Sequence, residues 1–491
     1  MPRVYACLME LDGARVPASS DGTGSGISSM DGDSLRNELT ELGKLLPSAS
    51  RHSPTAVTWE GSPYRQAAFD VQRAADVSVA AAVSAAAGLA RVRDRIAPSL
   101  AFDHTQTLAA FSGHLTVDGM ALPKWADLSG MYATGDDRVL QLHCNFPHHA
   151  AGVIDHLGLG GSDAMPDREA LAAEISQRSS FVLEQELIER GMIAAVCRTL
   201  DEWSEHPHCQ ATRDLPLLTV EQIGDADPRP LATDENEYEG RPAAGVRVVD
   251  ASRVLAGPVA GQTLAGFGAD VLRVGAAHLP AVEFGVLSTG FGKRNAHVDL
   301  DTDVGRTTMR SLLGDGTVLI DAYRPGALAS RGFSPQHVAE FAPGSVIVQL
   351  CAFDWIGPWA GRRGFDSIVQ STTGIALAGG EAAGVAGPLP LPVQALDYAT
   401  GFLAAFAALE LVRHQQEAGG TWLARLSLLR TRNWLVGAER PAPFEPAPLP
   451  ELSRWVHSVD SSFGRIEAPA SVGGFWDLPP APLGSSAPVW R

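Results

Sequence analysis

The sequence predicts an α/β fold in which a doubly wound, Rossmann-like parallel sheet occupies residues 236–430 and a second α+β domain precedes it. Three observations support this prediction. Short apolar runs of strand length alternate with helical segments after residue 245, and this alternation is typical of parallel strands joined through helices. A long apolar helical pattern follows at 397–418. An acidic, Pro-rich stretch at 222–242 reads as a linker between the two parts.

Composition bounds the class of protein. The chain has 491 residues, 45% of them hydrophobic and 19% charged, which suggests roughly three domains and a sizeable core. The formal net charge of −18 argues against nucleic acid and anionic membrane surfaces as main partners. The five cysteines form no CxxC pair, so we expect neither a disulfide framework nor a metal site, and a reducing cytoplasm as the location.

No signal-peptide pattern opens the sequence. The apolar run 74–90 is shorter than a membrane-spanning helix needs, and we expect a buried helix there. Residues 1–55 predict a weakly structured segment, with a Ser-, Gly- and Asp-rich loop at 18–33 and a helix over 34–46 capped by Ser34.

Residues 56–235 predict the first globular region. Helical patterns cover 64–93, 166–190 and 198–210, a strand and turn cover 115–119, and a hairpin covers 131–143. His143, His148 and His149 cluster beside Cys144. Metal binding is one interpretation, but the spacing matches no usual zinc pattern, and we favour a structural or surface role.

The βαβ region begins with a strand at 245–250, a turn at 255–258, a helix at 259–267 and a strand at 270–274. A helix at 304–313 and a strand at 317–321 follow, and then a helix capped by Ser334 with Pro335 in its first turn and a strand at 345–350. Ligands of such sheets bind at the carboxyl ends of the strands, here the loops 253–257, 322–326 and 351–353. The first loop lacks the full GxGxxG pattern, so a nicotinamide cofactor is not supported.

Asp397 precedes or opens the long helix, which ends at Gly419 and is followed by a strand at 422–429 and an irregular Pro-rich tail from 440. Two interpretations of Asp397 stay open at this point. Asp is a preferred N-cap residue. A carboxylate at a helix N-terminus is also favoured in its ionised form and can act as a covalent nucleophile.

Residues 245–430 resemble the family III CoA-transferases, which include formyl-CoA transferase, carnitine CoA-transferase and α-methylacyl-CoA racemase. The matching segments occur in the family's order: 253–258 (RVLAGP), 268–271 (GADV), 292–295 (GKRN), 323–326 (YRPG) and 357–366 (GPWAGRRGFD). Asp397 and its helix complete the match. The resemblance covers about two fifths of the chain.

The resemblance implies that Asp397 is the nucleophile, which forms an acyl–aspartyl anhydride and then an aspartyl–CoA thioester. It implies that Asp366 is an auxiliary acid or hydrogen-bonding group, although a turn residue is an equal alternative. Racemases of the family carry a His-Asp pair where this chain has Phe365 and Asp366, which speaks against racemisation. The CoA-binding positions that the resemblance implies are Leu255, Ala256, Lys293, Arg294, Tyr323 and Arg331.

This chain also departs from the family pattern. The acidic residue and Pro that usually follow the second strand are replaced by Gly275-Ala276-Ala277-His278, and the Gly-rich loop of formyl-CoA transferase has no clear counterpart after 430. Residues 125–235 resemble the family's smaller domain, and 71–76 weakly match 393–397. We therefore expect a fused, partly degenerate duplication in which Asp76 is a vestigial counterpart of Asp397.

The sequence thus predicts an enzyme that transfers CoA between carboxylic acids, as a homodimer that binds acyl-CoA and a carboxylic acid. CoA would be a substrate, with no prosthetic group and no metal. An acyl-CoA isomerase or lyase of the same fold, or a non-catalytic CoA-binding protein, are the alternatives.

Overall fold

The computed structural model describes residues 32–47, 57–94, 99–160, 165–231, 241–437 and 442–491. Most of the segment expected to be weakly structured, including residues 18–31 of the expected loop, lies outside these ranges, as do Cys7 and residues 232–240 of the expected linker. Residues 32 and 33, the end of that loop, are helical instead.

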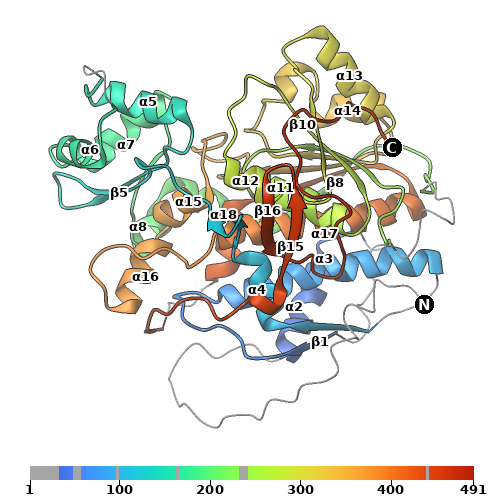
Figure 1. Ribbon diagram of the computed structural model, residues 1–491, viewed down its shortest axis with the longest axis horizontal. Coiled ribbons are helices and arrows are strands. Elements are labelled where there is room, and N and C mark those ends of the chain that lie inside the picture. The colour runs from blue at the N-terminus through green and yellow to red at the C-terminus, as the bar shows by residue number, and fades with distance from the viewer. Residues whose placement is uncertain (1–31, 48–56, 95–98, 161–164, 232–240, 438–441) are drawn as a thin grey trace.

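A seven-stranded sheet forms the centre of the molecule (Figure 1). Its strands run in the order β11 (Arg294–His297), β10 (Asp270–Gly275), β9 (Arg247–Ala251), β12 (Val318–Asp321), β13 (Val346–Cys351), β14 (Thr421–Ser427) and β8 (Leu218–Gly224). The first six are parallel, and β8 pairs antiparallel with β14. Counted along the chain, the parallel strands have the order 3-2-1-4-5-6, which is that of doubly wound α/β folds. The expected fold class is therefore confirmed.

Helices cover both faces of this sheet, as its uninterrupted apolar strands require. On one face, Val248, Val271 and Val346 pack with α11 (Ala256–Gly266) and α17 (Ala395–Ala418). On the other face, the alternate strand residues Val249 and Leu272 pack with α13 (Asp303–Gly314) and α14 (Pro335–Phe341).

The N-terminal region packs against the sheet region through α3 (Val71–Asp94), which lies along α17 (Figure 1). Within the described residues, 71–91 and 395–418 are long and apolar enough to cross a membrane, and both are largely buried inside the protein. The run at 74–90 was expected to be too short for a spanning helix, and this is wrong because the helix extends from Val71 to Asp94. The expectation that it is buried is confirmed.

A smaller α+β unit with its own core projects from the sheet region (Figure 1, upper left). It contains β5 (Gly130–Ala133), β6 (Val139–Leu142), β7 (Ala194–Val196), α5 (Pro147–His156), α6 (Arg168–Ile175) and α7 (Ser180–Glu189). The expected hairpin at 131–143 is confirmed as the β5–β6 pair.

Several predicted elements need correction. The helix expected over 166–190 is two helices, and that expected over 198–210 is divided by Pro207 into α8 (Leu200–Glu205) and α9 (Pro207–Thr212). Ser34 lies inside α2 (Gly32–Lys44) and is not its cap. Residues 222–224, assigned to the linker, belong to β8.

The Pro-rich tail is not wholly irregular. It forms a hairpin of β15 (Val456–Ser461) and β16 (Gly464–Pro469), which pairs with β3 (Thr116–Val117) of the N-terminal region. Strand β11 was not anticipated, because it is short and Ala296 is its only apolar residue. The remaining α-helices and strands are β1 (Val57–Glu60), β2 (Leu100–Asp103), α4 (His104–Phe111), β4 (Met120–Ala121), α12 (Glu283–Ser288), α15 (Asp366–Thr372), α16 (Ile375–Ala383) and α18 (Leu428–Val436). The domain boundaries stay predictions.

Candidate active site

A cavity of about 420 Å³ opens at the carboxyl ends of the parallel strands. Its walls include the loop 253–258 after β9, residues 274–276 at the end of β10, residues 298–301 after β11 and residues 322–325 after β12. Strands β9 and β12 are neighbours from which the chain winds in opposite directions, and ligands of doubly wound sheets bind at this switch point.

Asp397 lines this cavity from the first turn of α17. It is the third residue of the helix, and the N-cap position belongs to Gln394, so the capping interpretation is wrong. The Asp397 side chain is only 7% exposed, and the backbone N–H of Ala256 donates a hydrogen bond to its carboxylate.

Close packing of α11 on α17 brings Ala256 to Asp397. A Cβ atom on Gly401 would lie 2.6 Å from the carbonyl oxygen of Ala256, and one on Gly257 would lie 2.4 Å from Cβ of Ser252. Only glycine permits both approaches, since real Cβ contacts are longer than this. The two glycines therefore help fix the position of the Ala256 N–H.

Asp366 is the second carboxyl group of the site and the first residue of α15. It is completely buried and does not line the cavity. Its Oδ2 accepts the backbone N–H of Asp397 at 2.9 Å, and its Oδ1 accepts a hydrogen bond from Gln370. Asp366 therefore holds the first turn of α17 in place, which is a more specific role than that of a turn residue.

The two carboxyl groups titrate as a pair. Burial raises the pKa of Asp366 to about 6, against the opposing hydrogen bonds from Asp397, Gln370 and Leu396. Burial, and then repulsion by Asp366, raises the pKa of Asp397 well above its usual range. Burial therefore raises the pKa of both groups, and the helix N-terminus does not overcome this desolvation.

Lys293 and Arg294 lie outside the cavity walls, which corrects the expectation that they bind CoA phosphates. Lys293 is 1% exposed, and its Nζ lies 3.0 Å from both the Asp250 carboxylate and the Pro258 carbonyl oxygen. Arg294 forms a two-pronged ion pair with Asp270, at 2.8 Å to each oxygen. Both cations are already neutralised inside the fold, so neither can meet a phosphate group.

The other four predicted binding positions do line the cavity: Leu255, Ala256, Tyr323 and Arg331. Tyr323 is held by a 3.5 Å hydrogen bond from its hydroxyl to the Val274 carbonyl oxygen. Arg331 lies at the rim, where its guanidinium pairs with Asp301 at 2.7 Å.

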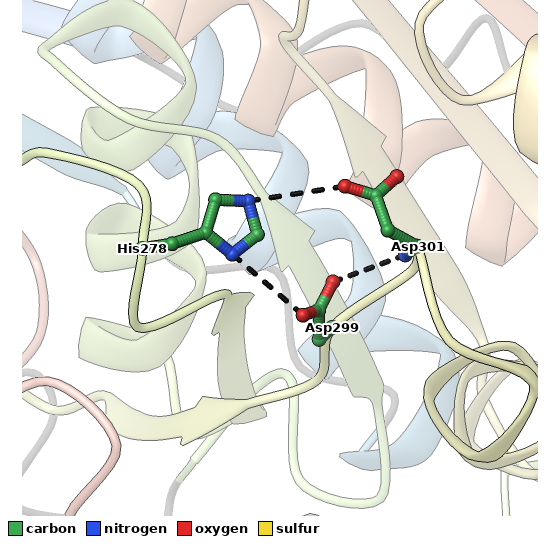
Figure 2. A group of neighbouring side chains, drawn as sticks. All are labelled: His278, Asp299 and Asp301. Carbon is green, nitrogen blue, oxygen red and sulfur yellow. Dashed lines mark hydrogen bonds and ion pairs between the residues drawn. The ribbon is translucent and has the colours of Figure 1, made fainter.

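Asp301 belongs to a rim cluster with His278 and Asp299 (Figure 2). The His278 ring lies between the two carboxylates, with Nδ1 3.6 Å from Asp299 and Nε2 3.8 Å from Asp301. One ligand atom from each residue falls within 4.8 Å of the others, a spacing that could hold a cation. His278 and Asp301 are exposed, and Asp301 already pairs with Arg331, so the charges of this cluster are largely satisfied.

The sequence interpretation missed several residues of the cavity. Arg253 and Arg363 both lie in segments that match the family, but their side chains were not singled out. The histidine cluster, for which a structural or surface role was favoured, contributes His148 and His149 to the wall. His143 is not part of the wall, and it stacks on Phe365 with ring centroids 3.9 Å apart.

Asp76, the expected counterpart of Asp397, lies in a different environment in α3. It is buried, and its carboxylate accepts hydrogen bonds from Gln72 at 2.9 Å and from Thr107. His104 Nδ1 lies 2.7 Å from its second oxygen. The adjoining cavity is about 20 Å³, which is too small for a substrate.

The part of the chain that carries Asp397 and the strand-end loops is similar to known proteins. The family model described as CoA-transferase family III matches residues 243–451. An acetyl-coenzyme A transferase of Hypoxylon pulicicidum is 32% identical over 40% of this chain and 34% of its own length. An acyl-CoA transferase of Gibberella moniliformis is 28% identical over 61% of this chain and 55% of its own length. A succinate–glutarate CoA-transferase of Agrobacterium fabrum is 30% identical over 36% of this chain and 48% of its own length.

The chain thus spans a third to somewhat over half of the length of these curated relatives. Among solved structures, a Mycobacterium tuberculosis protein is 28% identical over 40% of this chain and 56% of its own, with a TM-score of 0.35.

Proposed function

We propose that this chain, whose residues 243–451 belong to CoA-transferase family III, moves CoA from an acyl-CoA to a carboxylic acid with Asp397 as the nucleophile. One observation carries the proposal: a buried carboxyl group, with no counter-cation among the described residues, lies in the wall of a substrate-sized cavity at the strand ends. Burying such a group costs stability, so its presence indicates a functional role.

In the first half of the proposed reaction, the Asp397 carboxylate attacks the thioester carbonyl of the donor and expels the CoA thiolate. The product is a mixed anhydride of Asp397 and the donor acid. The thiolate then attacks the aspartyl carbonyl, so that the donor acid leaves as a carboxylate and an aspartyl–CoA thioester remains.

In the second half, the acceptor carboxylate attacks this thioester and expels the thiolate again, which forms an anhydride of the acceptor and Asp397. The thiolate finally attacks the acceptor carbonyl and frees the aspartate. Every step is an acyl transfer, so the scheme needs no prosthetic group.

Each neighbour of Asp397 has a role in this scheme. The Ala256 N–H, which donates to the resting carboxylate, is positioned to stabilise the oxyanion that forms when the aspartyl carbonyl is attacked. Asp366 fixes the backbone of Asp397 and helps to raise its pKa, so Asp397 must be in its ionised form when it attacks. A desolvated carboxylate is then the more reactive nucleophile.

CoA would lie along the strand ends, with its thioester at Asp397 and its nucleotide near Tyr323 and Arg331. An arginine meets phosphate oxygens well because its donors form a planar fork. The cytoplasmic location and the homodimer stay predictions.

The test is a transfer assay in which a panel of acyl-CoAs is incubated with a panel of free acids and the thioesters are separated by chromatography. We expect a new acyl-CoA to appear in step with loss of the donor, only when an acceptor is present. Hydrolysis that does not depend on an acceptor, or epimerisation of the donor, would contradict the proposal.

A further inference from the structure

The first turn of α5 closes the cavity from the side of the N-terminal region. Phe146, His148 and His149 all contribute to its wall, whereas Asp397 and the strand-end loops come from the other half of the chain. Phe146 links the two halves, because its ring lies 6.2 Å from that of Phe365 and 5.5 Å from that of His149. The residue after Phe365 is the buried Asp366, so this wall lies close to the reacting pair.

His149 is the most unusual group in this wall. Only 4% of it is exposed, and it lines the cavity. Its Nδ1 is enclosed and has no hydrogen-bond partner among the described residues. Buried polar groups nearly always have a partner. Burial, and then the charges of His148, His143, Arg363 and Arg253, lowers the pKa of His149 to about 3, so the neutral ring has one N–H to donate.

Two arginines of the cavity wall surround this position. The Arg253 guanidinium lies 4.9 Å from the centre of the Phe146 ring and donates to the Pro280 carbonyl oxygen. Arg363 donates to the Gly191 carbonyl oxygen at 3.0 Å. Neither arginine forms an ion pair with a carboxylate in the part of the chain that the structure describes, so both keep donors and charge for an anionic ligand.

The backbone of α5 adds to this arrangement. Phe146 is its N-cap and offers no side-chain cap, and Pro147 has no N–H. The N–H of His148 has no recorded partner among the described residues, and a helix N-terminus attracts negative charge. The neutral His149 ring, the two guanidinium groups and the N-terminus of α5 thus lie on one side of the cavity.

We propose that His149, together with the α5 N-terminus, Arg253 and Arg363, binds an anionic group of the substrate. This inference rests on the proposed function, since it assumes that an acyl-CoA enters the cavity. The anionic group has two possible sources: the diphosphate of CoA, or a second carboxylate on the acyl chain. In either case the N-terminal region completes the binding site of the C-terminal half.

The test uses the full-length Asp397→Asn protein, in which no acyl group can be transferred, with and without His149→Ala. Isothermal calorimetry measures the affinity for CoA, pantetheine, succinyl-CoA and butyryl-CoA. If the anion is the diphosphate, His149→Ala weakens CoA about tenfold and leaves pantetheine unchanged. If it is a carboxylate, the same change weakens succinyl-CoA about tenfold and butyryl-CoA by less than twofold.

Two further variants separate binding from folding. His149→Gln keeps an N–H donor and should recover affinity to within about threefold. His156→Ala removes a histidine from the same helix that pairs with Glu186 and lies outside the cavity wall, and it should change no affinity.

The inference is overturned if His149→Ala binds all four ligands as tightly as its parent, or weakens them all equally. A parent protein that binds no CoA at all would instead contradict the proposed function.

Discussion

Two aspartates in neighbouring helices, Asp397 in α17 and Asp76 in α3, have opposite surroundings. Asp76 accepts hydrogen bonds from Gln72 and Thr107 and contacts His104 at 2.7 Å. Burial raises its pKa, and these three partners oppose the rise. Burial lowers the pKa of His104, but the hydrogen bond and charge of Asp76 outweigh this and raise it overall.

The Asp397 carboxylate has fewer favourable partners than that of Asp76. Its carboxylate receives the Ala256 N–H and is repelled by Asp366, and no cation pairs with it among the described residues. It also borders about 420 Å³ of cavity, whereas Asp76 borders about 20 Å³.

The comparison teaches that burial alone does not identify a reactive carboxyl group. A fully partnered carboxylate is stabilised in one state and gains nothing from attacking a substrate. A carboxyl group that is buried, repelled by a second carboxyl group and accessible from a cavity destabilises the folded protein. That cost can be offset by its reactivity toward a substrate, which is a common conflict between stability and function. We therefore interpret Asp76 as structural and Asp397 as catalytic.

The largest expected effect is on turnover. Asp397→Asn should lower the rate of CoA transfer by at least about a thousandfold, because an amide cannot form the anhydride. Asp76→Asn should leave turnover per folded molecule within about threefold. Steady-state assays at a temperature where both variants are folded by circular dichroism make the comparison, and equal losses in the two would break it.

The same two positions should affect stability with opposite signs. Asp76→Ala leaves the buried Gln72 and Thr107 side chains and the half-buried His104 without their acceptor, and should lower the free energy of unfolding by about 1–3 kcal/mol. Asp397→Asn removes a carboxyl group whose raised pKa disfavours the folded state at neutral pH, so the melting temperature should stay equal or rise. Chemical denaturation at pH 7 measures both, and a large destabilisation by Asp397→Asn would count against the account.

The carboxyl pair should also make activity and stability depend on pH. Asp366→Asn removes the charge that raises the pKa of Asp397, so the rising limb of the kcat profile should move to lower pH. The folded-state pKa of Asp366 is raised to about 6, so its contribution to stability is present below about pH 4 and lost as pH rises through 6. Relative to Asp366→Asn, the wild type should therefore lose about 1–3 kcal/mol between pH 4 and pH 7. The coupling would be contradicted if wild type and Asp366→Asn had the same pH profile of kcat and the same pH dependence of the free energy of unfolding.

The smallest expected effect concerns the rim, where charges are exposed. Asp301→Asn frees Arg331 and should tighten CoA binding by no more than about fivefold, because partly exposed ion pairs are worth at most about 1 kcal/mol. The gain should vanish at high salt. Asp303→Asn is the matched control, since Asp303 pairs with Arg306 in α13 and lies outside the cavity wall. Calorimetry showing weaker binding by Asp301→Asn would indicate that the cluster, not Arg331, holds the ligand.

Local patterns in the sequence were sufficient for five of the seven strands of the sheet (β9, β10, β12, β13 and β14), for α17 and for the position of the cavity. The short, continuous apolar runs after residue 245 indicate strands that are buried on both faces, and each run can be recognised without knowing the rest of the fold. By contrast, Lys293 was misassigned because its partner Asp250 lies 43 positions away, and only the fold brings the two together.

The histidines of α5 illustrate the same limit. His149 reaches the cavity because the smaller unit docks against the strand ends, and no spacing in the sequence encodes that contact. The tail hairpin was missed for a similar reason, since β16 pairs with β3 from the other end of the chain.

The central claim is that Asp397, and not Asp76, is the nucleophile. The most direct measurement is mass spectrometry of peptides from wild-type protein incubated with an acyl-CoA and then trapped with hydroxylamine. The account predicts a hydroxamate on the peptide that contains Asp397 and none on the peptide that contains Asp76. A hydroxamate on Asp76, or unmodified Asp397 in protein that is turning over, would contradict it.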